Sequence, residues 1–407
     1  MASQQLPEFP FAREHGYNPS PLNAKLRHED PVSKVKLYDG SQAWIITKHE
    51  DCCEILDSSK LSADRRSHGY PEIHPGGHKA KHAKPTFINL DDPDHDKQRR
   101  MLESEFTPET VNKKWRPIME HTVDIILDKF IQKGRDQQPI DFMEEFANIV
   151  PPQVIYKVLG APEKDVERLS KDSELRNTTA RDAAESANKE LNDYMKDLVK
   201  QKIQQPRDDV ISKLVVEQYK SGNLSEGDIT TLAFLVLTAG NAALINSIGL
   251  GTLTLMQHPS QLVQFKKNPS MAAQIVNEIT RYHTISALNS RRAATENMDI
   301  RGKQVKKGEG VICSVQAGNR DEDKFSDPET FDIRRHFDKE DSLGFGYGPH
   351  RCQGEAISRV ELEIVFTKLF QKLPSLRLAK SPMNFIPPGA KHLKGSTLFT
   401  SKSLRPP

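Results

Sequence analysis

The stretch "LGFGYGPHRCQGEAIS", residues 343–358, places one cysteine among glycines and cations. Cys352 comes just before a helix-like run, where unpaired backbone N–H groups and the helix dipole stabilise an anion such as a thiolate. Gly346, Gly348 and Gly354 carry no Cβ, so the backbone can approach a flat ligand closely. A cysteine alone is most often an inert, small apolar side chain. The glycines and cations around this one favour the alternative, a loop that presents a thiolate to a ligand.

The elements that must position this loop are mostly helical. Amphipathic or apolar runs predict helices over six ranges, residues 106–134, 141–160, 182–205, 229–257, 270–283 and 354–373. "VKLYDGSQAWIIT" alternates around Asp39-Gly40 and predicts a hairpin, and residues 305–313 are a weaker candidate for a second one. Residues 66–84 are rich in Gly, Pro and His, which indicates a surface loop. We therefore expect one domain over residues 1–407, mostly α with small β-sheets (α+β).

The composition limits the class of protein. The 58 Lys and Arg against 56 Asp and Glu give a net charge of +2 spread along 407 residues, which argues against a nucleic-acid binder. Four cysteines suit a reducing compartment without a disulfide framework. The N-terminal residues contain no apolar run of the length of a signal peptide or membrane anchor. The sequence is therefore interpreted as a soluble cytoplasmic protein, although organelle association stays open.

One segment is long enough to cross a bilayer. Residues 229–257 carry no charged side chain. Asn241 and Asn246 interrupt the apolar run, and basic or aromatic belts do not flank it. Ser225 followed by Asp228 three residues later resembles a capping box. These features favour a long helix buried inside the domain over a membrane span.

The segment "FGYGPHRCQG" resembles the signature of the heme-thiolate family, the cytochromes P450: Phe, Gly, any residue, Gly, any, His, any, Cys, any, Gly. Every fixed position is filled in order. The resemblance implies the fold of that family and a heme b whose iron is ligated by Cys352, a ligand that donates electron density to the metal. It also implies that Phe345 and Gly346 lie close to the sulfur and that His350 reaches a heme propionate.

Three further stretches resemble the family in order and rough spacing. "EITR" supplies Glu278 and Arg281, a pair that the family buries and completes with a later cation, here Arg335. "DPDHDKQRR" supplies His95 and Arg99, and "SRRAATENMDI" supplies Arg292, for the heme propionates. Taken alone, an i,i+3 pair or a charged helix face is an ordinary solvated feature. The resemblance extends from about residue 39 to residue 373.

The charge-free helix corresponds to the family helix that crosses above the heme. A typical monooxygenase carries there a small pair, any residue, then an acid and a threonine that relay protons. This chain reads "AGNAALINS", so Ala239 and Gly240 match, Asn241 follows, and Ala242 and Ala243 replace the acid and the alcohol. Alanine cannot transfer a proton. The ordinary machinery of oxygen activation is therefore missing.

The soluble fungal nitric oxide reductases form the branch that the sequence resembles most. The stretches "FPF", "PVSKVKLYDGSQAWIITKH", "AGNA", "RYHTISAL" and "NRDEDKF" carry this resemblance. It implies that nitric oxide is reduced to nitrous oxide by a hydride taken directly from NADH or NADPH, without a redox partner. Ser286 is then a catalytic candidate beside Asn241 and the position of Ala243. Arg65, Arg176 and Arg291 are then the candidates for binding the dinucleotide phosphates.

Two departures keep other functions open. The branch has a threonine where this chain has Ala243, and Lys391 occurs where the branch has an Arg-Asp pair. One alternative is an atypical monooxygenase or peroxide-using enzyme that acts on a small organic substrate with separate redox partners. Another is a heme protein that senses a diatomic gas without turnover. The sequence does not choose between NADH and NADPH.

Overall fold

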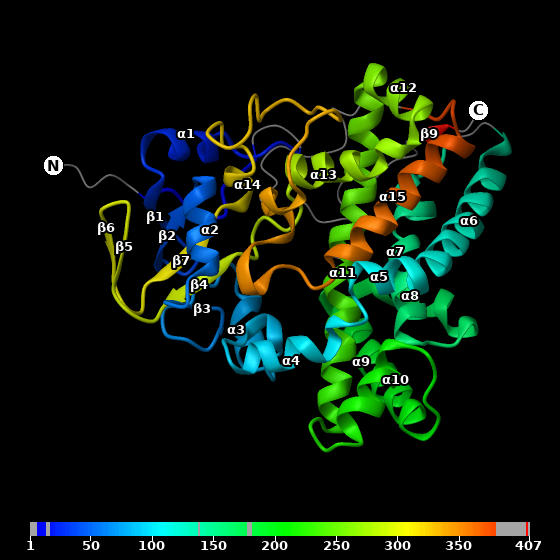
Figure 1. Ribbon diagram of the computed structural model, residues 1–407, viewed down its shortest axis with the longest axis horizontal. Coiled ribbons are helices and arrows are strands. Elements are labelled where there is room, and N and C mark those ends of the chain that lie inside the picture. Colours follow the sequence, from blue (N-terminus) through cyan, green and yellow to red (C-terminus); the bar gives the residue numbers. More distant parts are fainter. Residues whose placement is uncertain (1–5, 14–16, 137–138, 177–180, 380–403, 406–407) are drawn as a thin grey trace. The chain divides into compact units, whose positions relative to one another are not determined.

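The computed structural model describes every residue except 1–5, 14–16, 137–138, 177–180, 380–403 and 406–407 (Figure 1). It is mostly helical with small sheets, which confirms the predicted fold class. The chain forms two compact units. We call them the sheet unit (Met1–Arg99 and Asn277–Gln353) and the helical unit (Arg100–Val276 and Gly354–Ile386). The expectation of a single domain over residues 1–407 stays a prediction.

The sheet unit is built on a five-stranded sheet of order β1-β2-β7-β4-β3. Its strands are β1 (Val32–Lys36), β2 (Gln42–Ile46), β3 (Leu61–Ser62), β4 (Arg291–Ala294) and β7 (Gly310–Cys313). β1 and β2 pair antiparallel, with Val35 opposite Ala43, which confirms the predicted hairpin. Gly40 adopts φ +85° in the turn, a conformation that glycine takes without steric cost.

The second predicted hairpin is wrong. β6 (Lys303–Val305) pairs with β5 (Met298–Ile300), whereas β7 runs parallel to β2 and antiparallel to β4. Gly308, at φ +83°, does turn the chain, but its N–H donates to Ala294 O at 2.8 Å and so joins it to β4. All four residues of β7 are buried, so the apolar strand is more stable inside the sheet than in an isolated hairpin.

Among its described residues, the sheet unit also contains ten helical segments. They are α1 (Pro21–Glu29), α2 (His49–Asp57), α3 (Gly76–Lys81), η1 (Phe87–Asn89), α4 (Asp94–Glu103), α13 (Ala272–His283), α14 (Val315–Gly318), η7 (Lys339–Asp341), η8 (Leu343–Phe345) and η9 (Gly348–His350). Helices α4 and α13 continue into the helical unit. The short helix α3 lies in the stretch 66–84 that the sequence indicated as loop, and Glu72 in the same stretch is buried rather than solvated.

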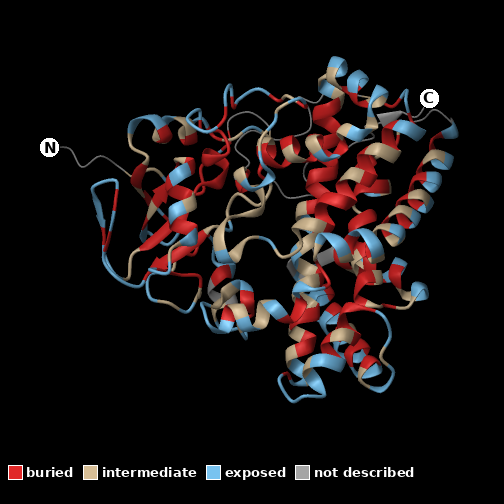
Figure 2. Ribbon diagram, viewed as in Figure 1, coloured by how far each residue is buried: buried red, intermediate tan, exposed pale blue. Residues whose placement is uncertain are grey.

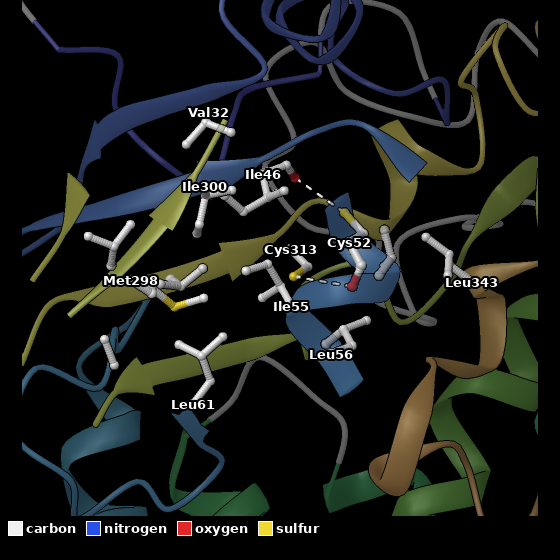
Figure 3. Close-up of a cluster of buried hydrophobic side chains, with 14 residues drawn as sticks. Val32, Ile46, Cys52, Ile55, Leu56, Leu61, Met298, Ile300, Cys313 and Leu343 are labelled. Carbon is white, nitrogen blue, oxygen red and sulfur yellow. Dashed lines mark hydrogen bonds between the residues drawn. The ribbon is translucent and has the colours of Figure 1, made fainter. Parts of the chain in front are cut away.

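The apolar core of the sheet unit lies between the strands and α2 (Figure 3). Ile46 of β2 and Ile55 of α2 are fully buried in it. Cys52 is buried and Cys53 is half-buried on α2. Leu343 belongs to the same core. The sheet core therefore extends to the first residue of the stretch that carries Cys352.

The helical unit holds the other described helices. They are α5 (Pro108–Thr110), η2 (Val111–Trp115), α6 (Arg116–Lys133), η3 (Gly134–Asp136), η4 (Met143–Ala147), α7 (Val150–Leu159), α8 (Glu163–Arg176), α9 (Arg181–Gln204), α10 (Val210–Leu214), η5 (Val215–Tyr219), α11 (Glu226–Gln257), α12 (Pro259–Lys267), η6 (Pro269–Met271) and α15 (Glu355–Lys372). A short ladder joins β8 (Arg377–Leu378) to β9 (Leu404–Arg405). The six predicted helical ranges are confirmed, whereas α8, α10 and α12 were missed.

Helix α11 corresponds to the charge-free segment. Ser225 Oγ and the Asp228 carboxylate form the predicted capping box at its start. The helix is long and apolar enough to cross a membrane, and half of its apolar stretch is buried inside the protein. It contacts α7, α9 and α15, and Figure 2 shows buried residues along much of its length. This packing supports the interpretation as a core helix.

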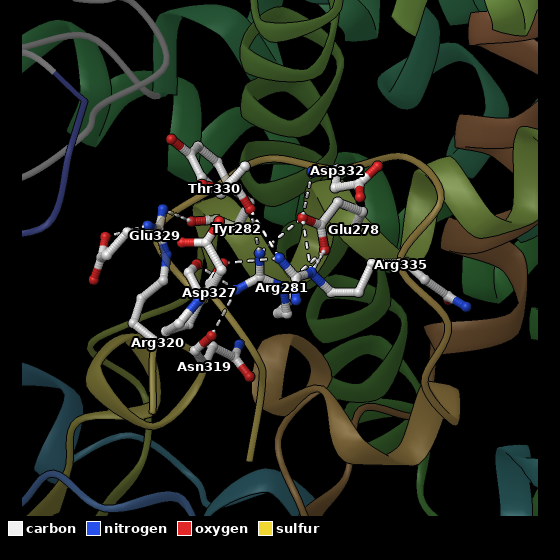
Figure 4. Close-up of polar contacts among 12 residues, drawn as sticks. Glu278, Arg281, Tyr282, Asn319, Arg320, Asp327, Glu329, Thr330, Asp332 and Arg335 are labelled. Carbon is white, nitrogen blue, oxygen red and sulfur yellow. Dashed lines mark hydrogen bonds and ion pairs between the residues drawn. The ribbon is translucent and has the colours of Figure 1, made fainter. Parts of the chain in front are cut away.

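Glu278 and Arg281 form the buried ion pair that the resemblance implied (Figure 4). Both side chains are fully buried, and two N–H groups of Arg281 donate to the Glu278 carboxylate at 2.7 Å each. Arg335 Nε lies 3.3 Å from the same carboxylate, which confirms it as the completing cation. Arg281 also donates to the carbonyls of Asn319 and Pro328 at 2.9 Å. The pair thus fixes a long irregular segment of backbone.

Replacing Glu278 by Ala should lower the free energy of unfolding by about 3–5 kcal/mol, because it leaves buried guanidinium charge without its carboxylate. Denaturant unfolding measures this change. The matched control is Glu296→Ala, which breaks an exposed pair with Lys60 in the same unit and should cost at most about 1 kcal/mol. Equal small losses in both variants would show that the Glu278 pair is not essential to folding.

Glu361 on α15 should make stability depend on pH. Its side chain is buried, its Oε1 has no hydrogen-bond partner among the described residues, and burial raises its pKa to about 8. The folded protein keeps this carboxyl protonated while the unfolded chain ionises near pH 4.5. Stability is therefore lost as the pH rises from about 4.5 to about 8, at about 1.4 kcal/mol per pH unit at most.

Glu361→Gln should remove this slope, since the amide stays neutral at every pH. Unfolding measured between pH 5 and 9 should therefore show a flatter profile for the variant and a larger stability at pH 8. Glu167→Gln, on the exposed face of α8, is the control and should leave the slope unchanged. A wild-type slope that persists in Glu361→Gln would contradict the assignment.

Candidate functional site

The Cys352 segment is a folded loop held by its own backbone hydrogen bonds. The N–H of Gly346 donates to Leu343 O at 3.0 Å, and the N–H of Cys352 donates to Phe345 O at 2.8 Å. Gly346 and Gly348 adopt φ +76° and +68°, a region that other residues rarely enter. Two of the three glycines that the sequence singled out are thus required by the backbone itself.

Close packing against α2 also requires a glycine in this loop. A Cβ on Gly348 would lie 2.8 Å from Leu56 O and 2.9 Å from the Asp57 carboxylate, closer than real Cβ contacts. The guanidinium of Arg351 donates to Gly346 O at 3.2 Å and so braces the loop from inside. Cys352 is exposed at the end of this braced loop, unlike the buried Cys52 of α2. The four cysteines form no disulfide with one another.

The structure brings together the four side chains that the resemblance assigned to heme propionates, His95, Arg99, Arg292 and His350. The rings of His95 and His350 lie 4.1 Å apart, centroid to centroid. Burial, followed by repulsion from Arg292, His95 and Arg99, lowers the pKa of His350 to about 3. Burial also lowers the pKa of Arg292. His95 Nδ1 lies 2.9 Å from the carboxylate of Asp92, a partner that the sequence analysis missed.

This cluster fits the carboxylates of a heme. His95 Nε2 is a buried nitrogen without a hydrogen-bond partner among the described residues, and such an atom is costly unless a ligand satisfies it. Arg292 and His350 add positive charge or hydrogen-bond donors next to it. Cys352, from the neighbouring loop, offers the sulfur that iron accepts. The residues that could hold a heme are therefore present on one unit of the chain.

A second group of charges contains two of the three arginines assigned to dinucleotide phosphates. Arg291 is buried and donates from Nη1 to the Glu72 carboxylate at 3.0 Å and to Pro71 O at 3.2 Å. Arg65 Nε lies 3.7 Å from the other oxygen of Glu72. Both guanidiniums lie over the ring of Tyr70, at 5.4 and 6.0 Å from its centroid. Sequence reasoning missed Glu72, because an acid in a Gly- and Pro-rich stretch gives no sign of burial.

The remaining candidates are less defined. Ser286 is half-buried in the turn between α13 and β4, where its carbonyl accepts from Asn289 N at 3.3 Å. Arg176 ends α8, and its side chain lies outside the described part of the structure. Lys391 also lies outside the described residues.

On α11 the small residues have an open side. Ala239 is exposed, Asn241 is buried, and a Cβ on Gly240 would find no described atom within 4 Å. The carbonyl of Ala243 accepts from Ser247 Oγ at 2.9 Å. The hydroxyl of Ser247, one turn after Ala243, therefore donates to the helix backbone.

Comparison with known proteins agrees with this site. The chain matches the cytochrome P450 family over residues 153–389. It is 44% identical over 377 residues to cytochrome P450 55A3 of Fusarium lichenicola, a match that covers 92% of each chain. It is 34% identical over 381 residues to cytochrome P450 105A3 of Streptomyces carbophilus, covering 93% of this chain and 92% of that protein. The higher identity with the Fusarium protein agrees with the resemblance to the fungal branch.

Solved structures of cytochromes P450 are also similar to this chain. Cytochrome P450 MoxA of Nonomuraea recticatena superposes with a TM-score of 0.90 at 34% identity, over 98% of this chain and 97% of that one. GfsF superposes with a TM-score of 0.89 at 32% identity, over 98% and 99%. Together with the braced Cys352 loop and the cation cluster beside it, these matches lead to one conclusion: the chain belongs to the cytochrome P450 family, the heme-thiolate oxidoreductases.

Proposed function

We propose that this chain reduces nitric oxide to nitrous oxide in the cytoplasm, with a hydride taken directly from NADH or NADPH. The observation that carries the proposal is the meeting of Arg65 and Arg291 at one buried carboxylate, Glu72. In the balanced reaction, two nitric oxide molecules, one NAD(P)H and one proton give one nitrous oxide, one water and one NAD(P)+. The reaction needs no separate redox partner.

Cys352 is the proposed iron ligand, and His95, Arg99, Arg292 and His350 are the proposed propionate partners. A bound heme supplies the redox-active iron at which nitric oxide is reduced. The chain itself supplies the anchoring charges and the thiolate. Phe345 and Gly346 belong to the same loop, whose backbone is fixed by the Cys352 N–H bond to Phe345 O.

The dinucleotide phosphates are proposed to compete with Glu72 for its two arginines. Arg65 and Arg291 together carry two positive charges, and Glu72 carries one negative charge, so these three side chains have a net charge of +1. Phosphate oxygens suit the bidentate donor geometry of a guanidinium as well as a carboxylate does. One oxygen of Glu72 has no hydrogen bond among the described residues, so this carboxylate does not use its full capacity to hold the arginines. The role of Arg176 in phosphate binding stays a prediction from the sequence.

Ser286 is proposed to orient the nicotinamide or to pass the proton that the reaction consumes. Its hydroxyl can both donate and accept a hydrogen bond, which the methyl group of Ala243 cannot do. Ala239 is exposed on α11, Gly240 has open space where a Cβ would lie, and Asn241 is buried. Their roles in cofactor binding stay predictions.

Ala242 and Ala243 favour a second candidate function. A heme-thiolate enzyme without the acid and the alcohol can still act as an atypical monooxygenase, or with peroxide, on a small organic substrate. The 34% identity with Streptomyces cytochromes P450 is compatible with this class. Separate electron-transfer proteins would then be partners. A heme protein that senses a diatomic gas without turnover is the third possibility.

Thiolate ligation is tested by the carbon monoxide spectrum of the reduced protein. The wild type should show the strongly red-shifted Soret band of a thiolate-ligated heme, and Cys352→Ala should abolish it, because alanine offers no ligand. Cys53→Ala, which removes a half-buried cysteine from α2 in the same unit, is the control and should keep the band. A histidine-type spectrum of the wild type would refute the ligand assignment.

The dinucleotide site is tested by nitrous oxide formation from nitric oxide with NADH or NADPH and no other protein. Arg65→Ala should raise KM about tenfold with a small change in kcat, because it holds phosphate equally in the ground and transition states. KM should also rise steeply with salt. Arg66→Ala is the control, since this neighbouring arginine is exposed and paired with Asp64. Ser286→Ala should lower kcat instead.

The two candidate functions give opposite outcomes in this assay. Absence of nitrous oxide with both cofactors would exclude the reductase. Tight coupling of electron flow to a hydroxylated product, with electron-transfer proteins added, would then establish the monooxygenase. Leakage of those electrons to peroxide is the outcome expected from Ala242 and Ala243.

A further inference from the structure

Asn319 contacts two segments that are far from it in the sequence, the end of α13 and the start of the Cys352 loop. The residue follows α14 and is fully buried. Its Oδ1 accepts from the N–H of Leu343 at 2.8 Å, and its Nδ2 donates to Thr284 Oγ1 at 2.9 Å. Its backbone carbonyl accepts from Arg281 at 2.9 Å. A single amide therefore links the Cys352 loop to the turn that carries Ser286.

The direction of these hydrogen bonds leaves one arrangement of the amide. A backbone N–H can only donate, so the Asn319 oxygen must face Leu343 and the amide nitrogen must face Thr284. The Thr284 hydroxyl accepts from that nitrogen and donates its own hydrogen bond to Arg281 O at 2.8 Å. Neither a carboxylate nor an apolar side chain at position 319 could make both contacts.

On one side, Asn319 holds the first residue of the Cys352 loop. Leu343 is buried in the sheet core (Figure 3). Two backbone hydrogen bonds connect Leu343 to Cys352. The carbonyl of Leu343 accepts from Gly346 N, and the carbonyl of Phe345 accepts from Cys352 N. A Cβ on Gly318 would lie 2.9 Å from Leu343 Cδ1, so α14 already packs at contact distance. A shift of Leu343 would therefore shift the frame of the cysteine.

On the other side, Asn319 holds a strained residue. Thr284 is buried and adopts φ +45°, which is rare for a β-branched residue and persists only where surrounding contacts hold it. The bonds from Asn319 and to Arg281 O are those contacts. Ser286 follows two residues later, so the conformation of Thr284 sets the direction in which the chain leaves α13 toward Ser286.

We infer that Asn319 is a positioning residue, which sets the Cys352 loop through Oδ1 and the Ser286 turn through Nδ2. The inference rests on the proposed ligation by Cys352 and on the proposed role of Ser286. Because Oδ1 hydrogen-bonds only to Leu343 and Nδ2 only to Thr284 among the described residues, a substitution can remove one contact and keep the other.

The experiment compares four variants by carbon monoxide spectrum and by steady-state turnover. Asn319→Ala loses both contacts, so the fraction of protein without the thiolate band should rise severalfold and kcat should fall about tenfold. Asn319→Asp keeps an acceptor for Leu343 but has no donor for Thr284, so the band should stay and kcat should fall. Thr284→Val should behave like Asn319→Asp. Thr284→Ser keeps the hydroxyl and should therefore keep the kcat of the wild type.

The matched control is Asn23→Ala. Asn23 is also a buried asparagine of the sheet unit, and its Oδ1 accepts from Ser314 Oγ at 2.9 Å. This variant should lose stability without a change in the spectrum or in kcat. If Asn319→Ala behaves like Asn23→Ala, Asn319 is structural only and the inference is overturned. If Asn319→Ala does not fold, unchanged kcat in both Asn319→Asp and Thr284→Val overturns it.

The outcomes also separate this inference from the proposed function. A wild type with the thiolate band but without nitrous oxide formation refutes the reductase, whereas loss of that band in Asn319→Ala still supports the role of Oδ1. A wild type without the thiolate band overturns both proposals.

Discussion

The buried pair of Glu278 and Arg281 is the constraint on which the sheet unit depends. Two charges taken out of water are tolerated only when every remaining donor and acceptor is used. The backbone meets this demand, since Asp332 N donates to Glu278 and the carbonyls of Asn319 and Pro328 accept from Arg281. A long stretch without regular secondary structure is thereby given one conformation. Asn319, whose carbonyl accepts from Arg281, connects this segment to the Cys352 loop, because its Oδ1 accepts from Leu343 N.

The two groups of cations in this unit differ in their counter-charges, and the difference matters for function. His95, Arg292 and His350 lie close together with one acid, Asp92, and burial, followed by repulsion from Arg292, His95 and Arg99, lowers the pKa of His350 to about 3. Such a site gains from any permanent anion, which suits a resident cofactor. Arg65 and Arg291 share a buried carboxylate instead. Under the proposed function, such a site suits a dinucleotide that binds reversibly, because Glu72 can pair with the two arginines again after the phosphates dissociate.

The uncharged helix α11 bears on the chemistry in another way. Its capping box and its packing against α7, α9 and α15 fix a long apolar element without any charged residue between Asp228 and Gln257. A helix without acid or alcohol at positions 242 and 243 has no side chain to relay protons there, and Ser247 donates to the backbone instead. Oxygen activation needs such a relay. The absence of this relay is what distinguishes α11 from the corresponding helix of a typical monooxygenase.

The sequence alone determined the family, the mostly helical fold, the first hairpin and the Cys352 signature, because these features are local: glycine conformation, helical periodicity and fixed spacing. It also paired Glu278 with Arg281 and Arg335. Only the tertiary structure decided that β7 lies inside the sheet, that Glu72 is buried between two arginines, and that Asn319 connects Thr284 to Leu343. These are contacts between residues far apart in the chain. A polar residue shows no sign of burial in its own sequence neighbourhood, since its partner is supplied by the fold.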